Sequence, residues 1–130
     1  MRTLIVEDEF VGRMQLKFFL EKYGSCDIAV DGKEALAANK MAIDEKKPYN
    51  LICLDIKMPG LDGHEVLSLI REQEESSKLD KSSRAKIFMT SALADPKNVF
   101  KAFQGLCDEY LAKPVDEDKL NILLKTHNLV

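Results

Sequence analysis

Short apolar runs alternate with amphipathic stretches from one end of the chain to the other. Five of the runs are bounded by polar or turn residues, as expected for buried strands. The predicted strands are Arg2–Val6, Cys26–Val30, Asn50–Leu54, Lys86–Thr90 and Asp108–Leu111. This alternation is typical of βα units that build a parallel sheet.

The stretches between these strands carry apolar residues at helical spacing. The predicted helices are Phe10–Tyr23, Gly32–Lys46, His64–Gln73, Pro96–Gln104 and a last helix that starts at Asp116. The apolar residues at helical spacing in the first helix are Phe10, Met14, Phe18 and Leu20. The polar stretch from Glu74 to Arg84 is predicted to be a loop.

These elements predict an α/β fold, with helices on both faces of a five-stranded sheet because parallel crossovers are right-handed. The sequence alone does not give the strand order. Acidic residues end the first and third strands, however, and this fits the flavodoxin-like order 2-1-3-4-5, in which those strands are neighbours. We expect a three-layer (βα)5 sandwich that forms a single domain over residues 1–130, without an output domain.

Composition narrows the class of protein. A length of 130 residues with 45% hydrophobic residues suits one domain. The net charge of -3 argues against direct binding of nucleic acid, which needs basic residues. The residues before the first strand lack the features of a secretion signal, so we expect no leader, and no apolar run approaches the roughly 20 residues that span a bilayer. Three cysteines without metal-ligand spacing suit core thiols in a reducing compartment. We therefore expect a cytoplasmic domain that binds no membrane.

Three acids end two of the predicted strands. Glu7 and Asp8 close the first strand and Asp55 closes the third. If those strands are neighbours, the carboxylates repel one another strongly unless a cation neutralises them. Mg²⁺ prefers such oxygen ligands. The pattern therefore predicts a magnesium site. In the alternative, the three acids only end their strands and face solvent, and the repulsion between their clustered charges is not compensated.

Residues at the other strand ends suit phosphoryl chemistry. An aspartate such as Asp55 can form an acyl phosphate when a metal and a cation offset the incoming negative charge. Lys113 can be that cation, because it ends the fifth strand and an X-Pro bond at Pro114 can be cis and aim the lysine inward. Thr90 and Ser91 end the fourth strand with two hydroxyls, and either could hydrogen-bond a phosphoryl oxygen.

With these residues in place, the chain resembles a response-regulator receiver domain and is similar to the CheY-like single-domain proteins of bacterial two-component signalling. The resemblance covers essentially all 130 residues. It rests on Glu7-Asp8, on Asp55-Ile56-Lys57-Met58-Pro59-Gly60 with Asp62-Gly63, on a hydroxyl residue before Ala92, and on Lys113-Pro114. Each motif alone is weak, but the combination is specific.

The resemblance implies that Asp55 accepts a phosphoryl group from a sensor histidine kinase or a histidine phosphotransfer protein. Asp8, Asp55 and the main-chain carbonyl of Lys57 would bind Mg²⁺, with Glu7 helping directly or through water. Lys113 would contact the phosphoryl group. The chain would be a phosphoryl acceptor that controls a downstream effector protein rather than an enzyme, and would act as a monomer or weak homodimer.

The family pattern also implies which residues respond to the phosphorylation of Asp55. It selects Ser91 over Thr90 as the switch hydroxyl, because the family's hydroxyl precedes a small residue at a fixed distance before the lysine. Tyr110 takes the place of an aromatic residue that swings inward when this hydroxyl moves; the alternative is a half-buried tyrosine that does not move. The modification would change the surface formed by the fourth helix, the fifth strand and the fifth helix, where Phe100 and Phe103 could contribute.

Some residues depart from the commonest family pattern. The first acid is Glu7 where aspartate is more usual. Lys57 places an ammonium near the path of an attacking water, and Leu93 offers no polar group two residues after Ser91. We therefore expect slow autodephosphorylation. The polar loop Gln73–Arg84 is longer than the family's usual connection. It could be an inert, solvated extension or a contact specific to a partner protein.

Other function classes fit less well. A phosphorelay intermediate that passes the phosphoryl group to a histidine phosphotransfer domain stays open. An aspartyl phosphatase would normally need a second acid where Lys57 stands. A flavin or nucleotide binder would need N–H groups or cations in the first loop, which Glu7 and Asp8 occupy. A degenerate receiver that only scaffolds is disfavoured because every key position is filled.

Overall fold

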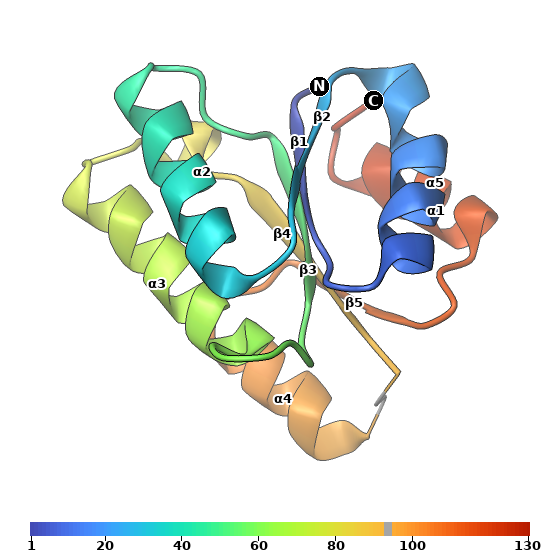
Figure 1. Cartoon of the computed structure of the whole chain (residues 1–130). Helices are drawn as coiled ribbons and strands as arrows, with labels where there is room; N and C mark the ends of the chain where they lie inside the picture. The colour runs from blue at the N-terminus through green and yellow to red at the C-terminus, as the bar shows by residue number, and fades with distance from the viewer. Residues whose placement is uncertain (93–94) are drawn as a thin grey trace.

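Five parallel strands form the centre of the molecule in the computed structural model (Figure 1), which describes residues 1–92 and 95–130. The strands are β1 (Thr3–Val6), β2 (Cys26–Ala29), β3 (Leu51–Asp55), β4 (Lys86–Ser91) and β5 (Glu109–Ala112). Their order in the sheet is β2-β1-β3-β4-β5, and this confirms the predicted arrangement. Because β1 and β3 pair directly, their acidic ends lie next to each other.

Helices follow the strands in alternation. They are α1 (Phe10–Leu20), α2 (Gly32–Asp44), α3 (Gly63–Ser76), α4 (Pro96–Gln104) and α5 (Glu117–Thr126), with short 3₁₀ turns at Glu21–Tyr23 and Lys81–Ser83. An aspartate side chain caps the N-terminus of each helix from α2 to α5 by accepting a backbone N–H three residues ahead. The caps are Asp31, Asp62, Asp95 and Asp116. Such caps satisfy donors that the helix itself leaves unpaired, and they fix where each helix begins.

The sheet separates two hydrophobic cores, one on each face. Alternate strand residues point to opposite faces. One core joins residues such as Leu4, Ile52 and Met89 to α2, α3 and α4. The other joins residues such as Ile5 and Phe88 to α1 and α5. In Figure 1, α1 and α5 lie together on one side of the strands and α2 and α3 on the other. This is the predicted three-layer sandwich.

Most of the apolar residues noted at helical spacing in α1 do not face the core. Phe10, Met14 and Phe18 are 66%, 43% and 70% exposed, whereas Leu16 and Leu20 are buried against the sheet. The helix carries two apolar stripes, and the spacing along the chain does not tell which one faces the core. The buried stripe is the one whose leucines fit the core shared with α5.

Helix α3 runs three residues beyond its predicted end at Gln73, so the expected loop begins later than Glu74. The reason is a tertiary contact. The buried Glu74 carboxylate accepts the Ala85 backbone N–H at 2.8 Å and the Arg71 guanidinium at 2.7 Å. The last turn of the helix therefore docks on the start of β4, which the local sequence did not reveal.

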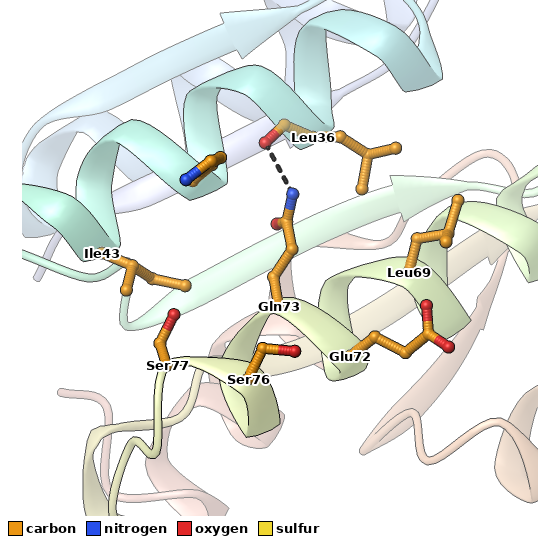
Figure 2. Close-up of a pocket in the computed structure, with 8 residues that line it drawn as sticks. Leu36, Ile43, Leu69, Glu72, Gln73, Ser76 and Ser77 are labelled. Carbon is orange, nitrogen blue, oxygen red and sulfur yellow. Dashed lines mark hydrogen bonds between the residues drawn. The ribbon is translucent and has the colours of Figure 1, made fainter.

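A groove of about 320 Å³ lies between α2 and α3. Figure 2 shows the residues that line it. Leu36, Ile43 and Leu69 form apolar walls, and Gln73 lies between the helices, where its amide donates to the Leu36 carbonyl at 3.1 Å. The Gln73 amide oxygen in turn accepts from the buried Asn39 at 2.8 Å. None of the acids that end β1 and β3 lines this groove, so it is separate from the site described below. Among the described residues, no helix is long and apolar enough to cross a membrane.

Candidate functional site

Three carboxylates meet at the carboxyl edge of the sheet. Glu7 and Asp8 directly follow β1, and Asp55 is the last residue of β3. One oxygen from each of the three lies within 4.8 Å of the others. Glu7 and Asp55 are almost fully buried. The predicted convergence of the three acids is therefore confirmed.

Lys113 reaches the same cluster from the end of β5. Its Nζ lies 3.1 Å from Asp55 Oδ1 and 2.5 Å from Glu7 Oε1. The Lys113–Pro114 bond is cis, as the sequence suggested, and the Lys113 backbone N–H donates to the Ser91 carbonyl at 2.9 Å. The lysine is thus anchored to the end of β4 while its ammonium faces the acids.

Burial and charge shift the protonation equilibria in this cluster. Burial raises the pKa of Glu7, and the neighbouring Asp55 carboxyl raises it further, while Lys113 acts in the opposite direction. For Lys113, burial acts to lower the pKa, but the bonds and negative charges of Glu7 and Asp55 outweigh it, and the pKa is raised. The lysine therefore stays charged, and the burial of Glu7 beside Asp55 acts against the ionised form of Glu7.

The donor set fits a hard divalent cation. Asp8 Oδ1 is buried and has no hydrogen-bond partner among the described residues, although a buried carboxylate oxygen costs free energy when it is unpaired. It lies in the cluster with Glu7 and Asp55, and all three offer the oxygen atoms that Mg²⁺ prefers. No hydrogen bond within the described part of the chain uses the Lys57 carbonyl, the fourth ligand that the sequence suggested.

The loop after β3 is held close to Asp55. The Ile56 N–H donates to the Thr90 carbonyl at 3.0 Å, and the Ile56 carbonyl accepts from Gly63 at 2.7 Å. Gly63 has no room for a side chain, because a Cβ there would lie 2.4 Å from the Asp55 carbonyl oxygen. The side chain of Lys57, between these anchors, is exposed to solvent.

The residues predicted to respond to phosphorylation of Asp55 lie on the expected strands. Thr90 pairs with Asp55 in the sheet, and Ser91 lies one position nearer the carboxyl edge, level with Ala112. Both hydroxyl residues are buried. Tyr110 is half-buried against the core formed with α2, α3 and α4. The choice of Ser91 as the switch hydroxyl and the movement of Tyr110 stay predictions.

Two of the residues predicted for the contact surface lie on α4. Phe100 and Phe103 are 66% and 45% exposed on α4, as a contact surface requires. Leu93, which was expected to influence hydrolysis, lies outside the described residues.

Sequence reasoning missed one residue that shapes the acidic loop. Arg13 of α1 donates to the main-chain carbonyls of Asp8, at 2.8 Å, and of Glu7, at 3.3 Å. These bonds tie the loop after β1 to the first turns of the helix. An arginine a little more than one helical turn after two acids was the available signal, but a charged residue on a helix is usually just solvated.

Comparison with known proteins places this architecture in one family. The family model of the response regulator receiver domain matches residues 3–125. The regulatory protein VanRB of Enterococcus faecalis is 34% identical over 125 residues, which cover 95% of this chain and 49% of that protein. The two-component response regulator ORR41 of Oryza sativa subsp. japonica is 27% identical over 128 residues, which cover 98% of this chain and 94% of that protein. The chain thus spans about half the length of VanRB and nearly all of ORR41.

Solved structures agree with the sequence relatives. A chain of the CheX–CheY–BeF3–Mg²⁺ complex from Borrelia burgdorferi superposes with a TM-score of 0.80 at 29% identity, covering 97% of this chain and 88% of that chain. The receiver domain of the sensor histidine kinase PA1611 from Pseudomonas aeruginosa, with magnesium coordinated in its active-site cleft, gives a TM-score of 0.77 at 25% identity and covers 96% of this chain and 94% of that one. With its parallel sheet, its acidic cluster and a family match over residues 3–125, the chain belongs to the response regulator receiver domains of two-component signalling.

Proposed function

We propose that this receiver domain is switched by Mg²⁺-dependent phosphorylation of Asp55. The observation that carries the proposal is the convergence of Asp55 with two further carboxylates and one lysine at a single sheet edge. The phosphoryl donor would be a sensor histidine kinase or a histidine phosphotransfer protein. Two solved relatives, one in a complex with BeF3 and Mg²⁺ and one with a magnesium ion coordinated in its active-site cleft, support the same assignment.

The transfer itself is a substitution at phosphorus. A carboxylate oxygen of Asp55 attacks the phosphorus atom of the donor, the bond between phosphorus and the donor histidine nitrogen breaks, and that nitrogen keeps the electron pair. The product is an acyl phosphate on Asp55. Asp8, Asp55 and the Lys57 carbonyl would hold Mg²⁺, with Glu7 assisting, and the bound ion supplies positive charge to the phosphoryl oxygens.

Lys113 has a defined task in this scheme. Its ammonium already lies 3.1 Å from Asp55 Oδ1, so it can neutralise charge on the incoming phosphoryl group without a large movement. The Ser91 hydroxyl would then hydrogen-bond a phosphoryl oxygen, and Tyr110 would respond by moving inward. The change would reach a downstream protein through the surface of α4, β5 and α5. Passing the phosphoryl group on to a histidine phosphotransfer domain is the alternative outcome.

We expect the acyl phosphate to hydrolyse slowly, so that the chain behaves as a phosphoryl acceptor rather than an enzyme. The support comes from Lys57, whose exposed side chain projects from the loop that follows Asp55. Purified phosphoprotein should keep its phosphoryl group for much longer than seconds, as measured by intact mass after removal of the donor. Complete loss within seconds would contradict the expectation.

Acetyl phosphate provides a test of the proposal that needs no partner protein. With Mg²⁺, the wild-type chain should gain one phosphoryl mass, and Asp55→Asn should gain none. Asp62→Asn is the matched control, because it removes a carboxylate from the same loop while asparagine can still cap α3; it should be modified like wild type. An equal adduct on Asp55→Asn, or no adduct on wild type, would refute the assignment.

A further inference from the structure

Gly12 lies in the first turn of α1, directly against the side chain of Glu7. Glycine is less favourable than alanine inside a helix, because it loses more conformational freedom on folding. Its φ angle is not in the left-handed region, so the backbone of this turn does not require glycine. The reason for glycine at this position must therefore be the space that it leaves.

That space is filled by the first acid of the site. A Cβ on residue 12 would lie 2.7 Å from Glu7 Oε1, 3.1 Å from its Cδ and 3.2 Å from its Cγ. The same Oε1 atom is 2.5 Å from Lys113 Nζ. The Glu7 side chain is only 2% exposed and is thus enclosed between Gly12 on one side and Lys113 with Asp55 on the other.

A methyl group at residue 12 would have to displace the Glu7 carboxyl rather than the backbone. A pocket of about 280 Å³ lies beside it, lined by residues of α1 and of the segment after β5, including Val11, Leu16 and Val115. The fold can therefore absorb the displaced carboxyl, but the contact between Glu7 and Lys113 cannot survive the movement unchanged. The effect of the added methyl group would fall on the site and not on the core.

We propose that Gly12 is a positioning residue of the phosphoacceptor site: it leaves the space in which Glu7, one methylene longer than an aspartate, folds back to hold Lys113. The inference rests on the proposed function of Asp55. It makes residues 7 and 12 a coupled pair, in which a side chain at residue 12 is tolerated only when the first acid is the shorter aspartate.

A double-mutant cycle tests this coupling. The rate of phosphorylation by acetyl phosphate with Mg²⁺ is measured for wild type, Gly12→Ala, Glu7→Asp and the double variant. Gly12→Ala should lower the rate by about three- to tenfold when Glu7 is present, which lies in the lower part of the range for contacting residues, and by less than about twofold in the Glu7→Asp background. Val11→Ala, on the same turn and 76% exposed in wild type, is the matched control and should keep the wild-type rate.

A second readout does not depend on phosphorylation. The backbone amide chemical shifts of Asp55 and Lys113 should change when Gly12→Ala is introduced into the chain with Glu7. They should remain unchanged when Gly12→Ala is introduced into the Glu7→Asp background. Melting temperatures should show that both alanine variants are folded. An equal effect of Gly12→Ala in both backgrounds, or no effect beside Glu7, would overturn the coupling. If no variant accepts a phosphoryl group, the proposed function fails, and the amide shifts still decide whether residues 7 and 12 are coupled.

Discussion

Arg71 is expected to be the polar side chain on which the fold depends most strongly. Its guanidinium donates five hydrogen bonds, all between 2.7 and 3.0 Å, to Glu74, to Asp108 and to the carbonyls of Ala85 and Leu106. The Arg71 side chain is 13% exposed and that of Glu74 only 2%. One residue thus joins the end of α3, the start of β4 and the turn before β5.

Replacing Arg71 by methionine keeps most of the buried stem but leaves the Glu74 carboxylate without its cation. Removing one partner of a buried ion pair costs about 3–5 kcal/mol, because the remaining charge is uncompensated. A domain of this size has about 5–15 kcal/mol of stability in total, so the variant should lose a large part of it. Replacing both Arg71 and Glu74 by methionine should recover part of the loss, since no unpaired charge then remains.

Urea unfolding followed by circular dichroism measures this effect. The midpoint of Arg71→Met should fall strongly while the slope m stays close to that of wild type. Arg84→Met is the matched control, because the Arg84 side chain makes one hydrogen bond among the described residues, at 3.3 Å to the Leu79 carbonyl; it should cost about 0.5 kcal/mol or less. Similar losses for both arginines, or a loss below about 1 kcal/mol for Arg71→Met, would refute the reasoning.

Three other predictions concern separate parts of the fold. Gly63→Ala should cost at least about 1–3 kcal/mol in urea unfolding, because its Cβ would meet the Asp55 carbonyl oxygen at 2.4 Å; wild-type stability would contradict this. Asp116→Ala should cost about 0.5–2 kcal/mol through loss of the α5 cap, whereas Asp116→Asn should cost little, and equal losses would contradict the capping role. Burial raises the pKa of Cys53 from 9.0 to about 12, so the unfolded thiol ionises first and stability should fall as pH rises from 9.0 to about 12, by about 1.4 kcal/mol per pH unit. Cys53→Ala should remove that contribution from urea midpoints measured across this pH range, and an unchanged slope would contradict it.

The sheet and the acidic cluster could be predicted from the sequence because local and global signals agree there. Each strand is a short apolar run, and each acid directly follows or ends its strand. Parallel strands bring their carboxyl ends to one edge, so knowing that β1 and β3 are neighbours is enough to bring Glu7, Asp8 and Asp55 together. The direct contact between Glu7 and Lys113 was not predictable in this way, since it depends on side-chain length and on the space at Gly12.

Other features depend on contacts between segments that are distant in the sequence. The spacing of apolar residues in α1 did not show which of them face the core, because Phe10, Met14 and Phe18 are as apolar as the leucines that pack inward. The end of α3 was placed too early because Glu74 has the character of a polar loop residue until its partners, Ala85 just before β4 and Arg71 on α3, are known. In both cases the tertiary environment decided between local alternatives of similar propensity.

The most direct test of the central claim is to locate the phosphoryl group by chemistry specific to acyl phosphates. Borohydride reduces an aspartyl phosphate to homoserine, and peptide mass spectrometry then shows which position has changed. After incubation with acetyl phosphate and Mg²⁺, homoserine should appear at residue 55 alone, and it should be absent when Mg²⁺ is chelated. Homoserine at position 8 or position 62 in place of residue 55, or none in fully phosphorylated protein, would contradict the account.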